Sequence, residues 1–339
     1  MIWLGILAVI FSIVAFFEWH IRSLGWSPSV VDSPDLWVEQ RKKASALGDK
    51  ALILVGASRM QLDMDTQVLR EKTKLEPIQL AIDGTSYLPV LENLANDPQI
   101  TGTVLVSVNA YNMRQGIPKD TSVQWVNYYE QIKNRGIEPY RLINNKIKAW
   151  LNNSLVTHLE GAKPYTVVSK LAFTQKTAGN YLITHADRSR DADYKKVQMP
   201  NFYAARLQRH FGRAVIKDAK TFDEFFSAYQ QAIKSTPVAG RPEFIKNLKH
   251  LIEVSNKIEA HGGKVIFIRF PTSKLVWEVD NKRYPKEKFW RVIAEKHPRS
   301  VNFSDYEKLK KFNAPDGSHL DYRDKKEFTT SLVKILKLK

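Results

Sequence analysis

The chain has 339 residues, 43% of them hydrophobic, which is typical of a folded protein and leaves room for more than one lobe. It contains no cysteine, and this excludes disulfide bonds and thiolate metal sites. The 52 Lys and Arg residues outnumber the 35 Asp and Glu residues, and the formal net charge of +17 favours an anionic partner, such as an acidic polymer or an anionic membrane face.

The chain begins with an uninterrupted apolar run, Ile2–Phe17, followed by Glu18 and Trp19. The run is slightly short for a full membrane span, but Trp19 and Trp26 are suited to the membrane–water interface. The basic segment and small-residue cleavage site of a cleaved signal peptide are both missing. We therefore predict an uncleaved transmembrane anchor over 1–22. A buried N-terminal helix is the alternative, and the absence of a polar face argues against it.

Residues 23–50 are predicted to form a tether and one packing helix. Pro28 and Pro34 interrupt regular structure near the anchor. The helix is expected over Leu36–Ala46, where Trp37 would pack against the domain.

Apolar runs then alternate with amphipathic stretches. The runs are largely aliphatic and show no polar alternation, which is typical of parallel strands buried on both faces. The strands are expected within Leu52–Val55, Ile78–Ile82, Val104–Val108, Lys264–Pro271 and Val301–Phe303. Helices are expected between and after them, over Gln61–Arg70, Leu88–Asn96, Arg241–Ala260 and Lys325–Leu338. This alternation predicts an α/β fold with a parallel sheet and crossover helices, whose core is divided between 51–112 and 241–339.

The region 113–240 interrupts the alternation and is predicted to be a helical, basic insertion or lid over the C-terminal edge of the sheet. Its helices are expected over Val123–Arg135, Arg141–Leu151 and Phe222–Lys234. Its middle is rich in basic residues, including Arg206 and Arg209. Because apolar periodicity is weak there, we expect four of these to face solvent and bind an anionic partner: Arg188, Arg190, Lys195 and Lys196. A solvated basic face without a partner is the alternative.

The first predicted strand ends in Gly56-Ala57-Ser58. Gly56 can adopt backbone angles closed to other residues, so the turn is expected to place Ser58 at the C-terminal edge of the sheet, where α/β folds carry their chemistry. Two interpretations of Ser58 stay open at this point. It is either a nucleophile or the cap of the next helix.

The other end of the chain carries Asp316 and His319, three residues apart before the final helix. A serine nucleophile needs an imidazole to accept its proton and a carboxylate to fix the imidazole tautomer. Two further polar turns follow predicted strands, at Gly84 and Asn109.

Taken together, the Gly-Ala-Ser turn at 56–58 and the Asp-Gly-Ser-His sequence at 316–319 resemble the SGNH/GDSL hydrolase superfamily. The resemblance implies a flavodoxin-like three-layer sandwich in which Ser58, Asp316 and His319 form the catalytic triad. It also implies that Gly84, through its backbone N–H, and Asn109, through its side chain, stabilise the oxyanion.

Together with the N-terminal anchor and the insertion, these motifs resemble membrane-anchored bacterial envelope members of the superfamily, which are DltD-like or similar to alginate O-acetylation proteins. This implies an esterase or O-acyltransferase that acts on an envelope polysaccharide or another anionic glycan through an acyl-serine. A membrane-bound O-acyltransferase is the implied acyl donor.

Two arginines are candidates for substrate binding. Arg59 follows the candidate nucleophile, and Arg269 stands at the end of the fourth predicted strand. A guanidinium at either position can hold an anionic group, although a surface ion pair is the alternative for Arg269.

Other functional classes lack their motifs. The chain has no Gly-x-Gly-x-x-Gly, no His-Glu-x-x-His and no histidines at ligand spacing, so we expect no cofactor and no metal. It has no helix-turn-helix or other nucleic-acid-binding signature, so we expect no nucleic-acid partner.

The location of the domain follows from the resemblance. Arg22 and Arg41–Lys43 lie after the anchor, and the positive-inside rule would place them in the cytoplasm, but long domains cross membranes largely regardless of charge. Because the implied substrates belong to the envelope, we expect a single-pass protein of the bacterial inner membrane with its domain in the periplasm.

A second functional class stays open. The nucleophile turn reads Gly-Ala-Ser where the family has Gly-Asp-Ser, and Asn109 is not followed by Asp. The rival hypothesis is a non-catalytic scaffold or binding module of an envelope polysaccharide complex.

Overall fold

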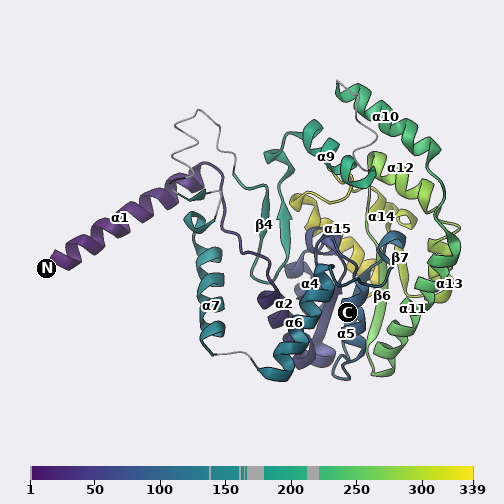
Figure 1. Ribbon diagram of the computed structural model, residues 1–339, viewed down its shortest axis with the longest axis horizontal. Coiled ribbons are helices and arrows are strands. Elements are labelled where there is room, and N and C mark those ends of the chain that lie inside the picture. The colour runs from purple at the N-terminus through teal and green to yellow at the C-terminus, as the bar shows by residue number, and fades with distance from the viewer. Residues whose placement is uncertain are drawn as a thin grey trace.

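The computed structural model describes residues 2–136, 139–159, 162–163, 165, 179–211 and 221–338. Its centre is a five-stranded sheet in the order β2-β1-β3-β6-β7, and every neighbouring pair is parallel (Figure 1). The strands are β1 (Ala51–Val55), β2 (Glu76–Gln79), β3 (Thr103–Ser107), β6 (Lys264–Arg269) and β7 (Ser300–Asn302). The predicted α/β fold with a parallel sheet is confirmed.

Alternate residues of the central strands point to opposite faces of the sheet, as strand geometry requires. Ile53 and Val55 join one apolar cluster, which is covered by α2 (Pro34–Leu47), α5 (Leu88–Ala95) and α11 (Arg241–Ala260). Residues of α6 (Thr121–Arg135) and α13 (Trp290–Lys296) also belong to this cluster. The sheet is therefore buried on this side by helices from both halves of the core.

The opposite face of the sheet carries a second cluster. Leu52 and Leu54 belong to it and pack with residues of α4 (Thr66–Thr73) and α15 (Tyr322–Leu336). Two short helices, α3 (Ser58–Leu62) and α14 (Glu307–Lys310), add residues at its margin. Helices on both faces make the strands apolar throughout, which is why they show no polar alternation in the sequence.

Two local expectations are wrong. The helix expected over Gln61–Arg70 is divided into α3 and α4, and the side chain of Asp65 caps α4 by accepting a hydrogen bond from Val68 N at 2.9 Å. Gly56 does not have a positive φ. Its hydrogen is needed for a close approach instead, because a Cβ there would lie 2.7 Å from Cβ of Ser107.

The described part of the insertion includes α6, α7 (Pro139–Ser154), a small antiparallel hairpin of β4 (Leu182–Thr184) and β5 (Arg190–Ala192), α9 (Met199–Phe211) and α10 (Phe222–Ser235). The hairpin was not predicted. Helices α9 and α10 pack with α12 (Lys274–Arg283) around a third apolar cluster, which attaches this part of the insertion to the core beside β6 (Figure 1).

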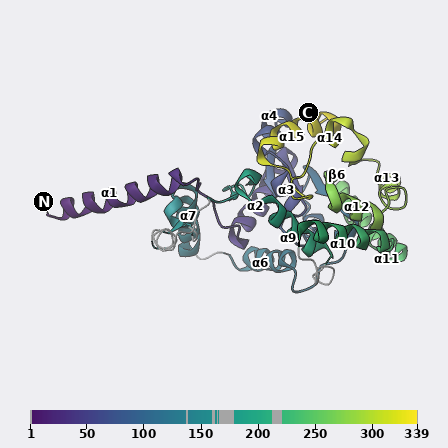
Figure 2. The ribbon, with the colours of Figure 1, turned by 90° about the horizontal axis from the view of Figure 1, so that it is seen from above.

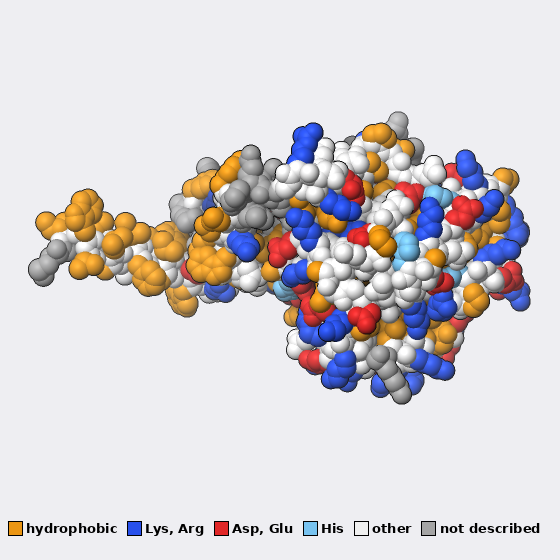
Figure 3. All heavy atoms as spheres, turned by 90° about the horizontal axis from the view of Figure 1, so that it is seen from below, with side chains coloured by type: hydrophobic (Ala, Val, Ile, Leu, Met, Phe, Trp, Pro, Cys, Tyr) orange, Lys and Arg blue, Asp and Glu red, His pale blue; other side chains and the backbone are white. Residues whose placement is uncertain are grey.

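Helix α1 (Ile2–Ser23) projects from the domain, and Figure 2 shows it extending well beyond the other elements. It is long and apolar enough to cross a membrane, and its hydrophobic side chains cover its surface in Figure 3. Only Ile21 among its residues is buried.

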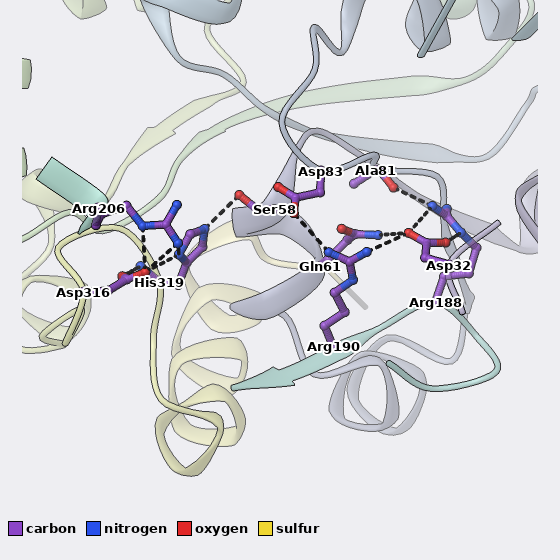
Figure 4. A network of polar contacts seen from close by, with 10 residues as sticks. All are labelled: Asp32, Ser58, Gln61, Ala81, Asp83, Arg188, Arg190, Arg206, Asp316 and His319. Carbon is purple, nitrogen blue, oxygen red and sulfur yellow. Dashed lines mark hydrogen bonds and ion pairs between the residues drawn. The ribbon is translucent and has the colours of Figure 1, made fainter. Parts of the chain in front are cut away.

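The expectation that four basic residues face solvent holds for Lys195 but is wrong for Arg188, Arg190 and Lys196; Lys196 is half-buried and donates to the carbonyl oxygens of Gly25 and Asn180. Arg188 has no exposed surface, and it donates to Asp32 of the tether (2.7 and 3.1 Å) and to the carbonyl oxygens of Gln79 and Ala81 (Figure 4). Arg190 donates to Asp32 and to Asp83. Weak apolar periodicity here reflects a buried polar network that joins the hairpin, the tether and the chain after β2.

We expect Arg188→Met to destabilise the protein by about 3–5 kcal/mol, because it removes one partner of a buried ion pair and leaves two carbonyl oxygens without their donor. Urea unfolding measures this difference. Lys195→Met is the matched control, because Lys195 has an exposed side chain, and it should change stability by less than about 0.5 kcal/mol. An equal, small effect of both substitutions would show that the buried network contributes little.

Candidate active site

Ser58, His319 and Asp316 lie together in a hydrogen-bonded chain (Figure 4). The hydroxyl Oγ of Ser58 is 2.8 Å from Nε2 of His319, and Nδ1 of His319 is 2.9 Å from Oδ2 of Asp316. Ser58 is half-buried, whereas His319 and Asp316 are buried. The structure thus brings together three residues that the sequence separates by up to 261 positions.

Ser58 reaches this position because β1 ends at Val55 and the tight passage of Gly56 beside Ser107 turns the chain into α3. Ser58 is the first residue of α3, and its N-cap position is occupied by Ala57 without a side-chain hydrogen bond. The hydroxyl of Ser58 therefore faces His319 instead of capping the helix.

The Asp316 carboxylate is held by the turn that contains it. Its Oδ1 accepts hydrogen bonds from the backbone N–H groups of Ser318 (2.9 Å) and His319 (2.8 Å), an arrangement that Asp favours in turns. Gly317 supplies the positive φ of 81° that this turn requires. Burial raises the pKa of Asp316, but His319, Arg206 and the Ser318 N–H outweigh it and hold that pKa well below its usual range.

The charge state of His319 suits a base. Burial lowers the pKa of His319, and the charges of nearby Arg206 and Arg59 lower this pKa further. The Asp316 carboxylate raises the pKa of His319, but the net pKa stays below the ordinary imidazole value. The imidazole is therefore neutral at neutral pH. Because ionised Asp316 only accepts, it selects the tautomer with hydrogen on Nδ1, which leaves Nε2 to accept from Ser58.

Arg206 contacts the same carboxylate from the insertion. Its Nε and Nη2 donate to Oδ2 of Asp316 at 3.1 and 2.8 Å, so one oxygen is shared between Arg206 and His319. Arg206 lies on α9, and sequence reasoning placed it only in a general basic stretch. Its role has no local sequence signal, because it depends on how α9 packs over the sheet edge.

We expect Arg206→Gln to move the acid limb of the kcat/KM profile to higher pH, because removing the cation raises the pKa of His319 and only neutral His319 accepts a proton. The wild-type limb should lie below about pH 6.5, the ordinary imidazole pKa. The rate of hydrolysis of a small neutral ester, measured across pH for the wild type and the variant, gives the acid limb of each. Arg209→Gln, on the same helix, is the control and should leave the limb in place. An unmoved limb in Arg206→Gln would contradict electrostatic coupling to His319.

A cavity of about 320 Å³ opens in front of Ser58. Its lining includes Gly84 and Asn109, so both predicted oxyanion residues share a cavity with Ser58. Gly84 has a φ of +69° in the turn after β2. The side-chain oxygen of Asn109 accepts from Arg59 Nη1 at 3.0 Å, and this leaves the amide N–H₂ group as a donor.

The two arginines predicted to bind substrate line different cavities. Arg59 is buried and donates through Nε to the Ser318 carbonyl oxygen at 3.1 Å as well as to Asn109, so it joins the nucleophile helix to the His319 turn. It also lines the cavity. Arg269 lines a separate small cavity beside Asp280, and its guanidinium lies 5.2 Å from the ring centre of Trp277. Arg269 does not reach the Ser58 cavity.

Asp63 is a buried residue that sequence reasoning missed. Its Oδ1 accepts from Leu320 N at 2.9 Å, which fastens the chain after His319 to the end of α3. Burial raises the pKa of Asp63 well above its usual range. Asp63 therefore helps to hold Ser58 and His319 at a constant separation.

The described part of the chain has no metal centre, because no cluster of three or more His, Cys, Asp or Glu side chains there could hold a metal ion.

No protein-family model matches this chain, and no curated protein matches it.

Proposed function

We propose that this protein is a serine esterase or O-acyltransferase of the SGNH type. The observation that carries the proposal is the hydrogen-bonded chain from Ser58 through His319 to Asp316, at 2.8 and 2.9 Å, beside an open cavity. Such a chain activates a serine for attack on an acyl carbonyl, and the same device serves hydrolysis and transfer.

In the proposed reaction, His319 Nε2 takes the hydroxyl proton while Ser58 Oγ attacks the carbonyl carbon of an ester. The oxyanion is stabilised by the backbone N–H groups of Ser58 and Gly84 and by the Asn109 amide. His319 then returns the proton to the leaving alcohol. The resulting acyl-serine transfers its acyl group to an incoming hydroxyl or to water, with His319 again as base.

The charge of the cavity supports an anionic substrate, such as an acidic envelope polysaccharide. Arg59, Arg206 and Arg209 line it, and Asp83 is the only carboxylate among the described lining residues. Arg209 is exposed, and none of the ion pairs found between described residues includes it. In this proposal α1 is a single-pass anchor in the bacterial inner membrane, the domain is periplasmic, and a membrane-bound O-acyltransferase supplies the acyl group.

A fluorophosphonate probe tests the proposal, because it reacts covalently with an activated serine. We expect full-length protein in detergent to be labelled once, with the adduct mapped to Ser58 by peptide mass spectrometry. Folded protein that is not labelled under these conditions would favour the rival, a non-catalytic scaffold of an envelope polysaccharide complex.

A further inference from the structure

Helix α7 exposes an apolar stripe. Tyr140, Ile143, Ile147 and Trp150 are exposed by 68%, 59%, 53% and 65%. Their spacing of three, four and three residues places them along one side of a helix with 3.6 residues per turn. A surface helix normally turns such a stripe towards the protein core. Here the stripe faces outwards, so the described chain does not cover it.

The contacts of α7 place it beside the end of α1. Glu18 accepts hydrogen bonds from the backbone N–H groups of Val156 (2.8 Å) and Thr157 (3.1 Å), immediately after α7. Arg22 donates to the carbonyl oxygen of Ser154, the last residue of α7, at 2.9 Å. The C-terminal end of α7 is therefore fastened to the turn of α1 that follows its apolar run.

This position is at the level of a membrane surface when α1 spans the bilayer. Trp19, which is 65% exposed, lies in the same turn of α1, and exposed Trp is enriched at the boundary between acyl chains and headgroups. Helix α7 runs across the direction of α1 in Figure 1, on the side of the domain from which α1 leaves. If α1 crosses a bilayer, this orientation places α7 along the membrane surface rather than through it.

Two lysines border the stripe. Lys146 and Lys148 are exposed, and helical geometry places them on opposite sides of the line through Ile143, Ile147 and Trp150. Lysine side chains so placed extend along apolar surface and present their ammonium groups to phosphates at the headgroup level. This pattern favours a surface of anionic lipids.

We propose that α7 is an interfacial helix, whose apolar stripe is embedded between the headgroups and acyl chains of an anionic lipid bilayer. With α1 it fixes the domain to the membrane at two places, which sets the height and orientation of the domain. The proposal requires α1 to be in the bilayer, but it holds whether or not Ser58 is an active nucleophile.

The absence of cysteine allows a direct test, because one introduced cysteine can be labelled uniquely. We would attach an environment-sensitive fluorophore to Ile147→Cys, and separately to Asn145→Cys on the opposite side of α7, in full-length protein reconstituted into phosphatidylcholine–phosphatidylglycerol vesicles. The label at 147 should be quenched by spin-labelled lipid and be several-fold less accessible to acrylamide, an uncharged aqueous quencher, than the label at 145. Trp150→Cys should repeat the result for 147 and guards against a local folding defect.

Two outcomes would overturn the proposal. Equal acrylamide quenching at 145, 147 and 150 would mean that the stripe stays in water. Shielding of 147 and 150 from both acrylamide and lipid quenchers would mean that protein, such as a second copy or a membrane partner, covers the stripe. A further variant tests the role of the two lysines. Quenching of the label at 147 by spin-labelled lipid should fall when Lys146 and Lys148 are replaced by Glu. An unchanged value would remove anionic lipid from the proposal.

Discussion

Ser58→Ala should reduce kcat/KM for a small ester by about 10⁴-fold or more, because in the proposed reaction the Ser58 hydroxyl accepts the acyl group and passes its proton to His319, 2.8 Å away. Any residual rate would come from substrate binding in the cavity and from the proposed oxyanion donors. Steady-state hydrolysis of p-nitrophenyl acetate by full-length protein measures the loss.

The control for this substitution is Ser235→Ala, because Ser235 is exposed at the end of α10, away from the cavity lining. It should hydrolyse the ester at the wild-type rate. If Ser58→Ala retains more than about a tenth of the wild-type kcat/KM, a role of Ser58 as nucleophile is ruled out, since losing a nucleophile costs far more than that.

The second large effect is expected for Asp316→Asn, at about 10⁴-fold in kcat/KM. The carboxylate accepts from His319 Nδ1, and an amide that turns its N–H₂ group towards that nitrogen favours the tautomer with hydrogen on Nε2. His319 could then no longer accept the proton of Ser58. The amide also replaces the charged partner of Arg206.

Circular dichroism and ester hydrolysis together measure the effect of Asp316→Asn, since a folded but inactive protein is the expected result. Asp49→Asn is the matched control, because Asp49 is exposed and lies at the opposite end of β1 from Ser58. A loss of less than about tenfold in folded Asp316→Asn protein would mean that the carboxylate does not set the His319 tautomer.

The sequence alone determined the five strands of the central sheet and its parallel character. Its aliphatic runs, such as Leu52–Val55, are short and unbroken because both faces of each strand are buried, and a periodic signal of this kind is local. Ser58, Asp316 and His319 were also singled out from the sequence, because the short motifs that contain them resemble those of the SGNH/GDSL superfamily and stand next to predictable elements. Where local polar capping decided the outcome, at Asp65, the predicted helix boundary was wrong.

Only the tertiary structure decided which partners the buried and half-buried arginines have. Arg206 reaches Asp316 across 110 positions, Arg188 is buried against Asp32 across 156, and Arg59 meets Ser318 across 259. The local sequence around an arginine does not reveal whether its side chain faces water or a buried partner. The difference arises from the packing of the insertion and the tether against the sheet, because desolvation and pairing of a charge depend on partners that are distant in the chain.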